Sequence, residues 1–563
     1  MTDPSPPFLV LAQVSASAAI EDTELPLDIW HWLLVVVPII VLLFLYVVRR
    51  WAGPEAGPVG LLLVAIIAVW FFEMPWEDLA VASGKGVWDA VPIVLVIFAA
   101  LVLYRLGTAA GAFFALRRGV EQFTKNRLFL VLAFGWIFAS FTQGIVGFGT
   151  PLVIVAPILL ALGVKPIYAV VIPLIGHAWA NFFGTLGVGW LATGQVISLD
   201  DELLTAVLTA LLLFVVIFCV GVGLAWIIGR WQAVLHALPF ILIQTVVLGG
   251  VQLGVVLFSP ELSTFLAGSA ALLTLLVLAR WSRYAEPFDL DESPALEDRD
   301  DEKEESEETR EPVMNMWMAL APYGILTVLS VVALTIPPVQ ETLERFAFGM
   351  PFPATETGFG VAMDAEEMYE PFTPLAHPSG LLLLAVLLSW ALYGARGYFA
   401  KWREQDDPPP VVRTALSDGV PATTAIVIFL VLSSIYSHSG QVDVLAFGVG
   451  EVAPPPVYAF LAPVIGIVGA LVTSSSTSSN ILFAPMQDAV AAAHDLNQAG
   501  VIAGQSAGGS IGNVIAPVNL TLGAAAAGIA GKEGTIMRIC ALWLLPVALI
   551  IGALTIPMAL IGS

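Results

Sequence analysis

Two polar, glycine-rich stretches interrupt apolar sequence, and they hold most of the side chains that could bind a ligand. The first is Gly144–Pro151, which lies between the apolar runs Leu128–Ala139 and Leu152–Val164. Glycine and proline do not continue a regular helix comfortably, and non-helical backbone inside a membrane must be buried in protein or line a cavity. The stretch therefore predicts a substrate site, or else a kink at a close helix contact. Its candidate binding residues are Gly147, Phe148, Gly149 and Thr150.

The second stretch, Thr473–Asn480, carries seven hydroxyl groups and one amide. Helix packing in membranes usually needs only one or two hydroxyls, so this run favours a binding hairpin over helix–helix contacts. Hydroxyls and unwound backbone can bind a carboxylate or coordinate Na⁺. The candidate substrate ligands here and farther along the chain are Ser478, Ser479, Asn480, Gln487, Gln505 and Asn513. The candidate ligands of a coupling ion are Thr473 and Ser476.

His177 and Asn181 follow the first interruption and are four residues apart, so on a helix they would share one face. A titratable group inside a membrane span is costly unless it is paired, and it is a functional candidate by default. Histidine also titrates near neutrality. We therefore expect His177 to carry a coupling proton and Asn181 to bind substrate. The alternative is a neutral histidine that bonds to a neighbouring helix.

The composition assigns the chain to the membrane. Of its 563 residues 58% are hydrophobic and 12% are charged, and the mean hydropathy is +0.89, whereas a soluble domain is about 25% charged. Apolar runs such as Leu33–Val48, Val91–Tyr104 and Leu203–Ile228 recur throughout. Since each crossing needs roughly 20 residues, we expect an all-α polytopic membrane protein with about 12 (10–14) transmembrane helices.

An acidic stretch, 286–312, separates two membrane halves, 28–285 and 313–563, and residues 1–27 form an N-terminal tail. Each half carries one of the interrupted regions. Matching interruptions in two halves are typical of inverted-repeat secondary transporters, whose broken or re-entrant helices hold the substrate. The acidic stretch itself predicts a disordered linker, with a docking tail as the alternative.

The charge distribution predicts the orientation. The few basic residues cluster in loops such as 117–127, 280–283 and 401–413, and the positive-inside rule places these loops and the acidic linker in the cytoplasm. The N-terminus then lies outside a multi-pass protein of the cytoplasmic membrane. The net charge of −23 leaves many acids in the other loops, which is typical of proteins from salt-loving organisms.

Several kinds of partner and chemistry find no support in the sequence. Cys219 and Cys540 both lie in apolar runs and predict neither a disulfide nor a metal site. Ionisable residues in the spans are scattered rather than clustered, which argues against a membrane enzyme and gives no catalytic residues. We expect no cofactor, no metal and no nucleic-acid partner. The oligomeric state stays open.

Four motifs occur in an order that resembles the L-lactate permease family of bacterial and archaeal 2-hydroxycarboxylate transporters. They are Gly147–Pro151, Ser478–Gln487, Gly508–Pro517 and Gly531–Arg538. The resemblance implies an ion-coupled secondary transporter that imports a small monocarboxylate such as L-lactate or glycolate, together with protons, across the lipid bilayer.

Two positions depart from the pattern of that family. Ser476 stands where the family usually has an acid, and Asn513 where it usually has a lysine. Both charges are missing, as if lost as a compensating pair. A divergent transporter of another small organic anion, or one coupled to Na⁺, is therefore an alternative. A channel is a weaker one, because two asymmetric halves suit a rocking transporter better than a symmetric pore.

Overall fold

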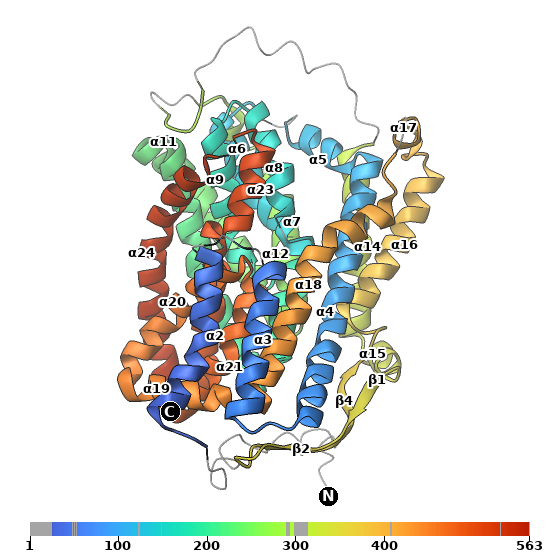
Figure 1. Ribbon diagram of the computed structural model, residues 1–563. Helices are drawn as coiled ribbons and strands as arrows, with labels where there is room; N and C mark the ends of the chain where they lie inside the picture. The colour runs from blue at the N-terminus through green and yellow to red at the C-terminus, as the bar shows by residue number, and fades with distance from the viewer. Residues whose placement is uncertain are drawn as a thin grey trace, which may run out of the picture.

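The computed structural model describes residues 25–47, 49, 51, 53–121, 124–147, 149–288, 293–297, 314–405, 408–529 and 531–561. Most of them form helices that run between two opposite ends of the molecule (Figure 1). By length and composition, eight of the described helices are suited to cross a bilayer. The expected all-α polytopic membrane protein is therefore confirmed. Shorter apolar helices lie beside these eight, and several of them meet end to end at breaks in the backbone.

The helices before the acidic stretch are α2 (Ile29–Val47), α3 (Gly53–Phe71), α4 (Trp76–Ala110), α5 (Ala112–Glu121), α6 (Arg127–Leu132), η2 (Ala133–Phe138), α7 (Ala139–Ile145), α8 (Thr150–Ala161), α9 (Pro166–Gly176), η3 (Ala178–Ala180), α10 (Gly184–Gly194), α11 (Glu202–Val256), α12 (Pro260–Leu278) and α13 (Ser282–Ala285). Those after it are α14 (Met316–Thr335), α15 (Pro337–Glu344), α16 (Pro378–Ala395), α17 (Ala400–Arg403), α18 (Val411–His438), α19 (Gln441–Val452), α20 (Pro455–Thr473), α21 (Ser476–Ala493), α22 (Gln498–Gly512), η4 (Asn513–Ile515), α23 (Pro517–Ala526) and α24 (Glu533–Leu560).

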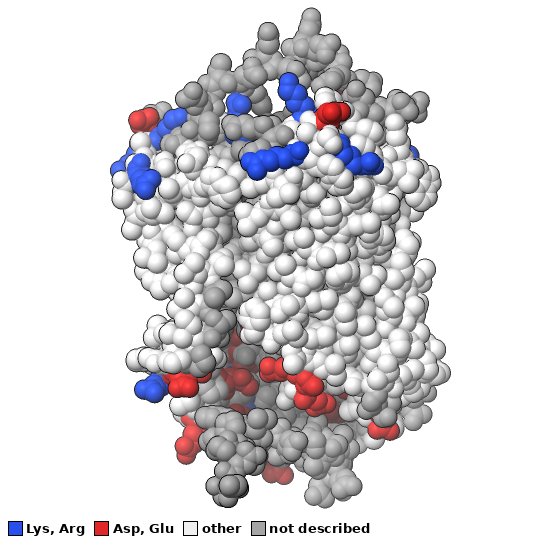
Figure 2. All heavy atoms as spheres, turned by 180° about the vertical axis from the view of Figure 1, so that it is seen from behind, with Lys and Arg blue, Asp and Glu red and all other residues white. Residues whose placement is uncertain are grey.

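Charged residues gather at the two ends of the molecule. Figure 2 shows most of the Lys and Arg near one end, most of the Asp and Glu near the other, and a broad belt without charges between them. We call the end that carries α5 and α17 the basic face and the end that carries the β-strands the acidic face (Figure 1). An uncharged belt between two polar ends is the arrangement that a bilayer requires.

Two nested β-hairpins cover part of the acidic face. The strand β1 (Phe348–Phe352) pairs antiparallel with β4 (Glu366–Phe372), and β2 (Thr355–Glu356) pairs with β3 (Ala362–Met363). The hairpins are fastened to the start of α4, where the Glu356 amide donates to the Asp78 carboxylate at 3.0 Å. From the sequence alone this region is only an acidic loop. In the structure the strands β1–β4 cover the start of α4, and we call them the cap.

Two of the helix breaks fall at the interrupted stretches Gly144–Pro151 and Thr473–Asn480. Gly149 adopts a left-handed φ of 79° between α7 and α8, and Ser474 adopts a φ of 56° between α20 and α21. Left-handed backbone is natural for glycine and uncommon for other residues. After α9 the chain passes through η3 and a second left-handed turn at 185–187. The helix α22 is followed by η4, and α23 then begins. Pro517 is the first residue of α23, a position that proline favours.

The two halves of the sequence are interleaved in space. The helices α3 and α4 pack against α18 (Figure 1). The helix α11 packs against α22. Contacts between early and late helices therefore hold the bundle together. Helix packing of this kind depends on close approach of small residues.

The expected acidic linker lies partly outside the described residues, because 289–292 and 298–313 are not described. Its segment 293–297 packs against the bundle. The Lys165 ammonium donates to the Ser293 and Pro294 carbonyls at 3.2 and 3.1 Å, and the Lys165 amide donates to the Ala295 carbonyl at 2.8 Å. These contacts hold at least this part of the linker in place.

The contact between α20 and α22 depends on glycine and gives a test of the packing. A Cβ atom on Gly508 would overlap the Pro463 carbonyl, whereas a Cβ atom on Gly250 of α11 would meet nothing within 4 Å. Overpacking costs about 1–3 kcal/mol. We expect Gly508→Ala to lower the melting temperature of the purified protein and Gly250→Ala to leave it unchanged or raise it. A Gly508→Ala protein that melts at or above the wild-type temperature would contradict this packing.

Candidate functional site

A small polar cavity lies where the helix breaks meet. Its volume is about 40 Å³, which is room for a few water molecules at roughly 10–15 Å³ each. Among the described residues, the lining contains no Asp, Glu, Lys or Arg, so His177 is its one side chain that could carry a charge near neutral pH. The lining residues are Gln143, Gly149, His177, Asn181, Gly184, Thr185, Ser474, Ser475, Ser476, Thr477, Asn513 and Asn519.

Each of the four breaks contributes to this cavity. Gly149 comes from the α7–α8 break, His177 from the α9–α10 break, Ser474 from the α20–α21 break and Asn513 from the segment before α23. Two of these breaks precede the acidic stretch and two follow it. Interrupted segments of both halves therefore line one cavity.

The first residues of three helices face the cavity. The helix α8 starts directly after Gly149, α21 starts at Ser476, and α23 carries Asn519 in its first turn. The first N–H groups of a helix have no partner within the helix, and the helix dipole places partial positive charge there. Converging helix N-termini suit a negatively charged ligand such as a carboxylate.

A chain of amide side chains crosses between the two halves. The Asn513 amide donates to the Asn181 side-chain oxygen at 3.1 Å, and the Asn519 amide donates to the Asn513 side-chain oxygen at 3.0 Å. Asn181 also donates to the Ser510 carbonyl at 2.9 Å. Because Asn181 comes from the α9–α10 break, whereas Asn513 and Asn519 come from η4 and the first turn of α23, the bonds tie the α9–α10 break to the break before α23. They also hold three amide groups at the cavity wall.

His177 lies at the cavity but not on a regular helix. The helix α9 ends at Gly176 and a short 3₁₀ turn follows, so the expectation that His177 and Asn181 share a helix face is wrong. The backbone turn nevertheless brings both side chains to the cavity, where each is buried. The His177 Nδ1 donates to the Pro173 carbonyl at 2.5 Å, because a carbonyl can only accept. In the neutral ring Nε2 then keeps a lone pair.

Four of the predicted ligands in the second half lie behind the cavity rather than in its lining. The Gln487 amide donates to the Gln505 side-chain oxygen at 3.0 Å, and the Gln505 amide reaches the Ser479 carbonyl at 3.3 Å. The Ser506 hydroxyl donates to the Asn480 side-chain oxygen at 3.0 Å. These buried bonds join α21 to α22 and support the hairpin whose tip lines the cavity.

Other predicted residues stand next to the cavity. A Cβ atom on Gly147 would overlap the Thr185 hydroxyl, so glycine there makes room for that side chain. The Ser478 amide donates to the Ser475 hydroxyl at 3.2 Å, and the Thr473 hydroxyl donates to the Gly469 carbonyl at 2.8 Å. Thr150 opens α8. Phe148 lies outside the described residues.

Several lining residues are not among the sequence candidates. They are Gln143, Gly184, Thr185, Ser474, Ser475, Thr477 and Asn519. A signal for some of them was present, because Gln143 directly precedes the first interruption and Asn519 follows Pro517 by two residues. Thr185 could not be found in this way, since only the left-handed turn at 185–187 directs it to the cavity.

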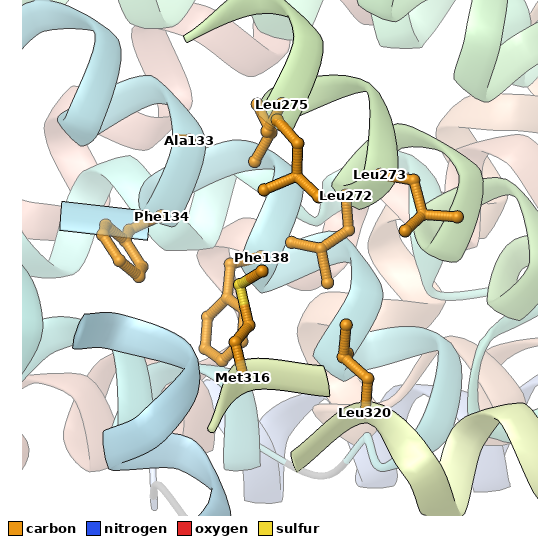
Figure 3. A pocket seen from close by; sticks show the side chains of 9 residues that line it. Ala133, Phe134, Phe138, Leu272, Leu273, Leu275, Met316 and Leu320 are labelled. Carbon is orange, nitrogen blue, oxygen red and sulfur yellow. The ribbon is translucent and has the colours of Figure 1, made fainter. Parts of the chain in front are cut away.

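A second, apolar crevice opens between η2, α12 and α14 (Figure 3). It is lined by Ala133, Phe134, Phe138, Leu272, Leu273, Leu275, Leu276, Met316 and Leu320. Its volume is about 10 Å³, and its lining side chains offer no hydrogen-bonding group. It cannot orient an anion and is not a candidate site.

Comparison with known proteins gives the same family over almost the whole chain. The family model of L-lactate permease matches residues 31–561. The glycolate permease GlcA of Escherichia coli strain K12 is 27% identical, over 93% of this chain and 95% of its own. The L-lactate permease of Halalkalibacterium halodurans is 26% identical, over 89% of this chain and 92% of its own.

Among solved structures, the YdaH transporter of Alcanivorax borkumensis aligns with 83% of this chain and 86% of its own, at 14% identity and a TM-score of 0.42. The family match rests on the sequence and covers every helix that contributes to the polar cavity. The chain belongs to the L-lactate permease family, and it is a membrane permease rather than an enzyme.

Proposed function

We propose that the chain is a proton-coupled secondary transporter that imports small 2-hydroxycarboxylates, such as L-lactate or glycolate, across the cytoplasmic membrane. The observation that carries the proposal is the polar cavity at the meeting point of helix breaks from both halves. Secondary transporters hold substrates at such breaks, and helix N-termini favour anions. The relatives named above are permeases for glycolate and L-lactate, and the small cavity suits a ligand with few atoms.

The chemistry of the cavity matches the two functional groups of a 2-hydroxycarboxylate. The N-termini of α8 and α21 and the hydroxyls of Ser474–Thr477 would donate to the carboxylate. The amide chain of Asn181, Asn513 and Asn519 has both donors and acceptors for the substrate hydroxyl. A ligand with only a carboxylate, or only a hydroxyl, would leave part of the cavity lining without a hydrogen-bond partner.

His177 supplies the proposed link between substrate and proton. An anion buried without a counter-charge is costly, and the described lining carries no permanent cation. A proton on Nε2 of His177 would make the ring a cation and balance the carboxylate. Proton and substrate would then enter the cavity together, which is the basis of symport.

Sodium coupling is the alternative. The hydroxyls of Ser474–Thr477 gather several oxygen atoms at the same cavity, and hard cations prefer oxygen ligands. The proposed proton coupling is favoured because a titratable ring lies in the lining beside them. Both mechanisms place the coupling ion next to the substrate.

We further propose that the basic face lies in the cytoplasm. Lys and Arg gather there in Figure 2, and the positive-inside rule favours that orientation. The acidic linker then lies in the cytoplasm and the N-terminus lies outside. The interleaved halves, 28–285 and 313–563, would rock around the cavity in the manner of inverted-repeat transporters.

Transport itself can be tested with the purified protein in sealed vesicles. We expect an inward proton gradient to drive accumulation of labelled L-lactate or glycolate without sodium. Unlabelled substrate inside the vesicles should accelerate entry of the label, because a carrier exchanges its substrates and a channel does not. Uptake that requires a sodium gradient, or entry without acceleration by exchange, would contradict the proposal.

Thr185 offers a test of the cavity. We expect Thr185→Val to weaken substrate binding about 5- to 100-fold, because removing one buried hydrogen-bonding partner costs about 1–3 kcal/mol. The matched control is Thr193→Val on the same helix, since Thr193 bonds to the Gly189 carbonyl and is outside the cavity lining. The measurement is the substrate dependence of exchange. Equal effects of the two substitutions would reject the assignment.

His177 offers a test of coupling. In the wild type, uptake at fixed sodium concentration should rise as the external pH falls, because protonation supplies the counter-charge for the substrate. His177→Gln keeps a hydrogen-bonding side chain but cannot become a cation, so we expect its uptake to lose this pH dependence. A variant with the wild-type pH profile would exclude His177 as the proton carrier.

A further inference from the structure

Two charged side chains are enclosed near the acidic face, away from the cavity. Among the residues that the structure describes, Lys85 and Asp89 are the only Lys, Arg, Asp or Glu residues that are buried, each with 3% of its surface exposed. They stand four residues apart on α4 and so share one face. Enclosing charges within a membrane protein is costly, and such residues usually mark ion or proton pathways. Neither residue is among the site residues predicted from the sequence.

The strand β4 covers this pair. The Lys85 ammonium lies 3.0 Å from the Glu366 carboxylate and 4.6 Å from the centre of the Tyr369 ring. The Tyr369 hydroxyl donates to Oδ2 of Asp89 at 3.2 Å. The hairpin cap thus places Tyr369 in contact with both buried charges. It also places the partly exposed carboxylate of Glu366 above them.

One oxygen of the buried acid has no partner. Oδ1 of Asp89 is enclosed and makes no hydrogen bond to any described residue. A carboxylate oxygen left in this condition loses its water without compensation. A proton on Oδ1 would remove the charge. The vacant oxygen therefore indicates a group that binds and releases a proton, rather than a fixed structural ion pair.

The surrounding charges also favour proton binding. Three carboxyl groups, those of Asp89, Glu366 and Glu370, face one ammonium group, and neighbouring carboxylates resist simultaneous ionisation. Partial burial and the neighbouring Glu366 carboxylate raise the pKa of Glu370 above its ordinary value, while Lys85 opposes the shift. The groups that act on Asp89 are Glu370, Tyr369, Lys85 and Glu366.

Other elements add few charges to this region. Lys85 acts on His438 of α18, and Glu202 at the start of α11 acts on Glu370. The helix α10, which also packs against α4, has no ionisable side chain. In Figure 2 acidic side chains gather at this end of the molecule and some are seen within a recess. Protons from the surrounding water would therefore meet carboxylates before they reach Asp89.

The helix α4, which carries the buried pair, is linked to cavity-lining elements through α18 and α10. The Ser434 hydroxyl donates to the Ala82 carbonyl of α4 at 2.8 Å, and the adjacent Ser433 hydroxyl donates to the Ile481 carbonyl of α21 at 3.0 Å. The N-terminus of α21 lines the cavity, and so do Gly184 and Thr185 of α10. A change of charge on α4 thus acts on a helix that contacts cavity-lining elements directly.

We propose that Asp89 is a proton-binding station between the acidic face and the cavity. The inference rests on the proposed proton-coupled transport. A proton from water binds the vacant Oδ1 and converts the carboxylate into a neutral carboxyl group, and the proton leaves again toward the cavity. The positive charge of Lys85 favours the ionised carboxylate of Asp89, so the proton can be released again. Asp89 does not touch the substrate, so substrate exchange does not require it.

The test compares two kinds of transport in the same vesicles. One is uptake of labelled L-lactate driven by a pH gradient, and the other is exchange of labelled for unlabelled L-lactate at equal pH. We expect Asp89→Asn to reduce gradient-driven uptake at least tenfold and to keep exchange within about twofold of wild type. Asp89→Glu restores the carboxyl group and should recover gradient-driven uptake. Retained exchange also shows that the variant is folded.

Two further variants separate proton binding from a merely structural role. Asp78→Asn alters a different bond between α4 and the cap and should keep gradient-driven uptake. Tyr369→Phe removes the hydrogen bond to Asp89 but leaves its carboxyl group, so it should shift the pH dependence of uptake without abolishing it.

The outcomes are distinct. Wild-type gradient-driven uptake in Asp89→Asn would overturn the inference, and so would equal loss of uptake and exchange. Failure of the wild type to accumulate L-lactate or glycolate with protons would instead overturn the proposed function, and the inference with it.

Discussion

The need to satisfy every backbone polar group inside a bilayer governs this structure. Water is absent from the hydrocarbon core, so a helix can be interrupted only where protein or a polar cavity supplies hydrogen-bond partners. The four breaks that line the cavity lie together, and hydrogen bonds join the break between α22 and α23 to the α9–α10 and α20–α21 breaks. Asn181, for example, donates to the Ser510 carbonyl and accepts from Asn513. The cavity lies where interrupted helices from both halves meet, and we propose that the helix N-termini there bind an anion.

Charge balance is the second constraint and explains where titratable groups occur. The described cavity lining has no fixed charge, so an anionic substrate needs a partner that arrives with it. His177 lies at the cavity and Asp89 lies beneath the cap on the acidic face. In the proposed mechanism the proton reaches His177 through Asp89. In the same proposal, the amide and hydroxyl groups orient the substrate, and the proton lowers the free-energy cost of burying the carboxylate charge.

The sequence predicted the fold class and the positions of breaks at Gly144–Pro151 and Thr473–Asn480 because both follow from local rules. Long apolar runs must span the bilayer, and glycine, proline and hydroxyl clusters must interrupt helices. It predicted His177, Asn181 and Asn513 at the site for the same reason. It placed Asn480, Gln487 and Gln505 there as well. In the structure their side chains form hydrogen bonds between α21 and α22 instead. This difference depends on tertiary packing, which the local sequence does not determine. The cap formed by β1–β4 depends on contacts with α4 far away in the sequence, so neither it nor the buried pair beneath it could be read from local pattern.

The central claim is that one proton moves with each carboxylate. The most direct measurement uses sealed vesicles that contain the protein and a pH-sensitive dye, without sodium and with equal pH on both sides. An inward gradient of L-lactate or glycolate should then acidify the lumen, and the acidification should disappear when the protein is left out. Substrate entry that leaves the internal pH unchanged would contradict the account, since it would show that the carboxylate crosses without a proton.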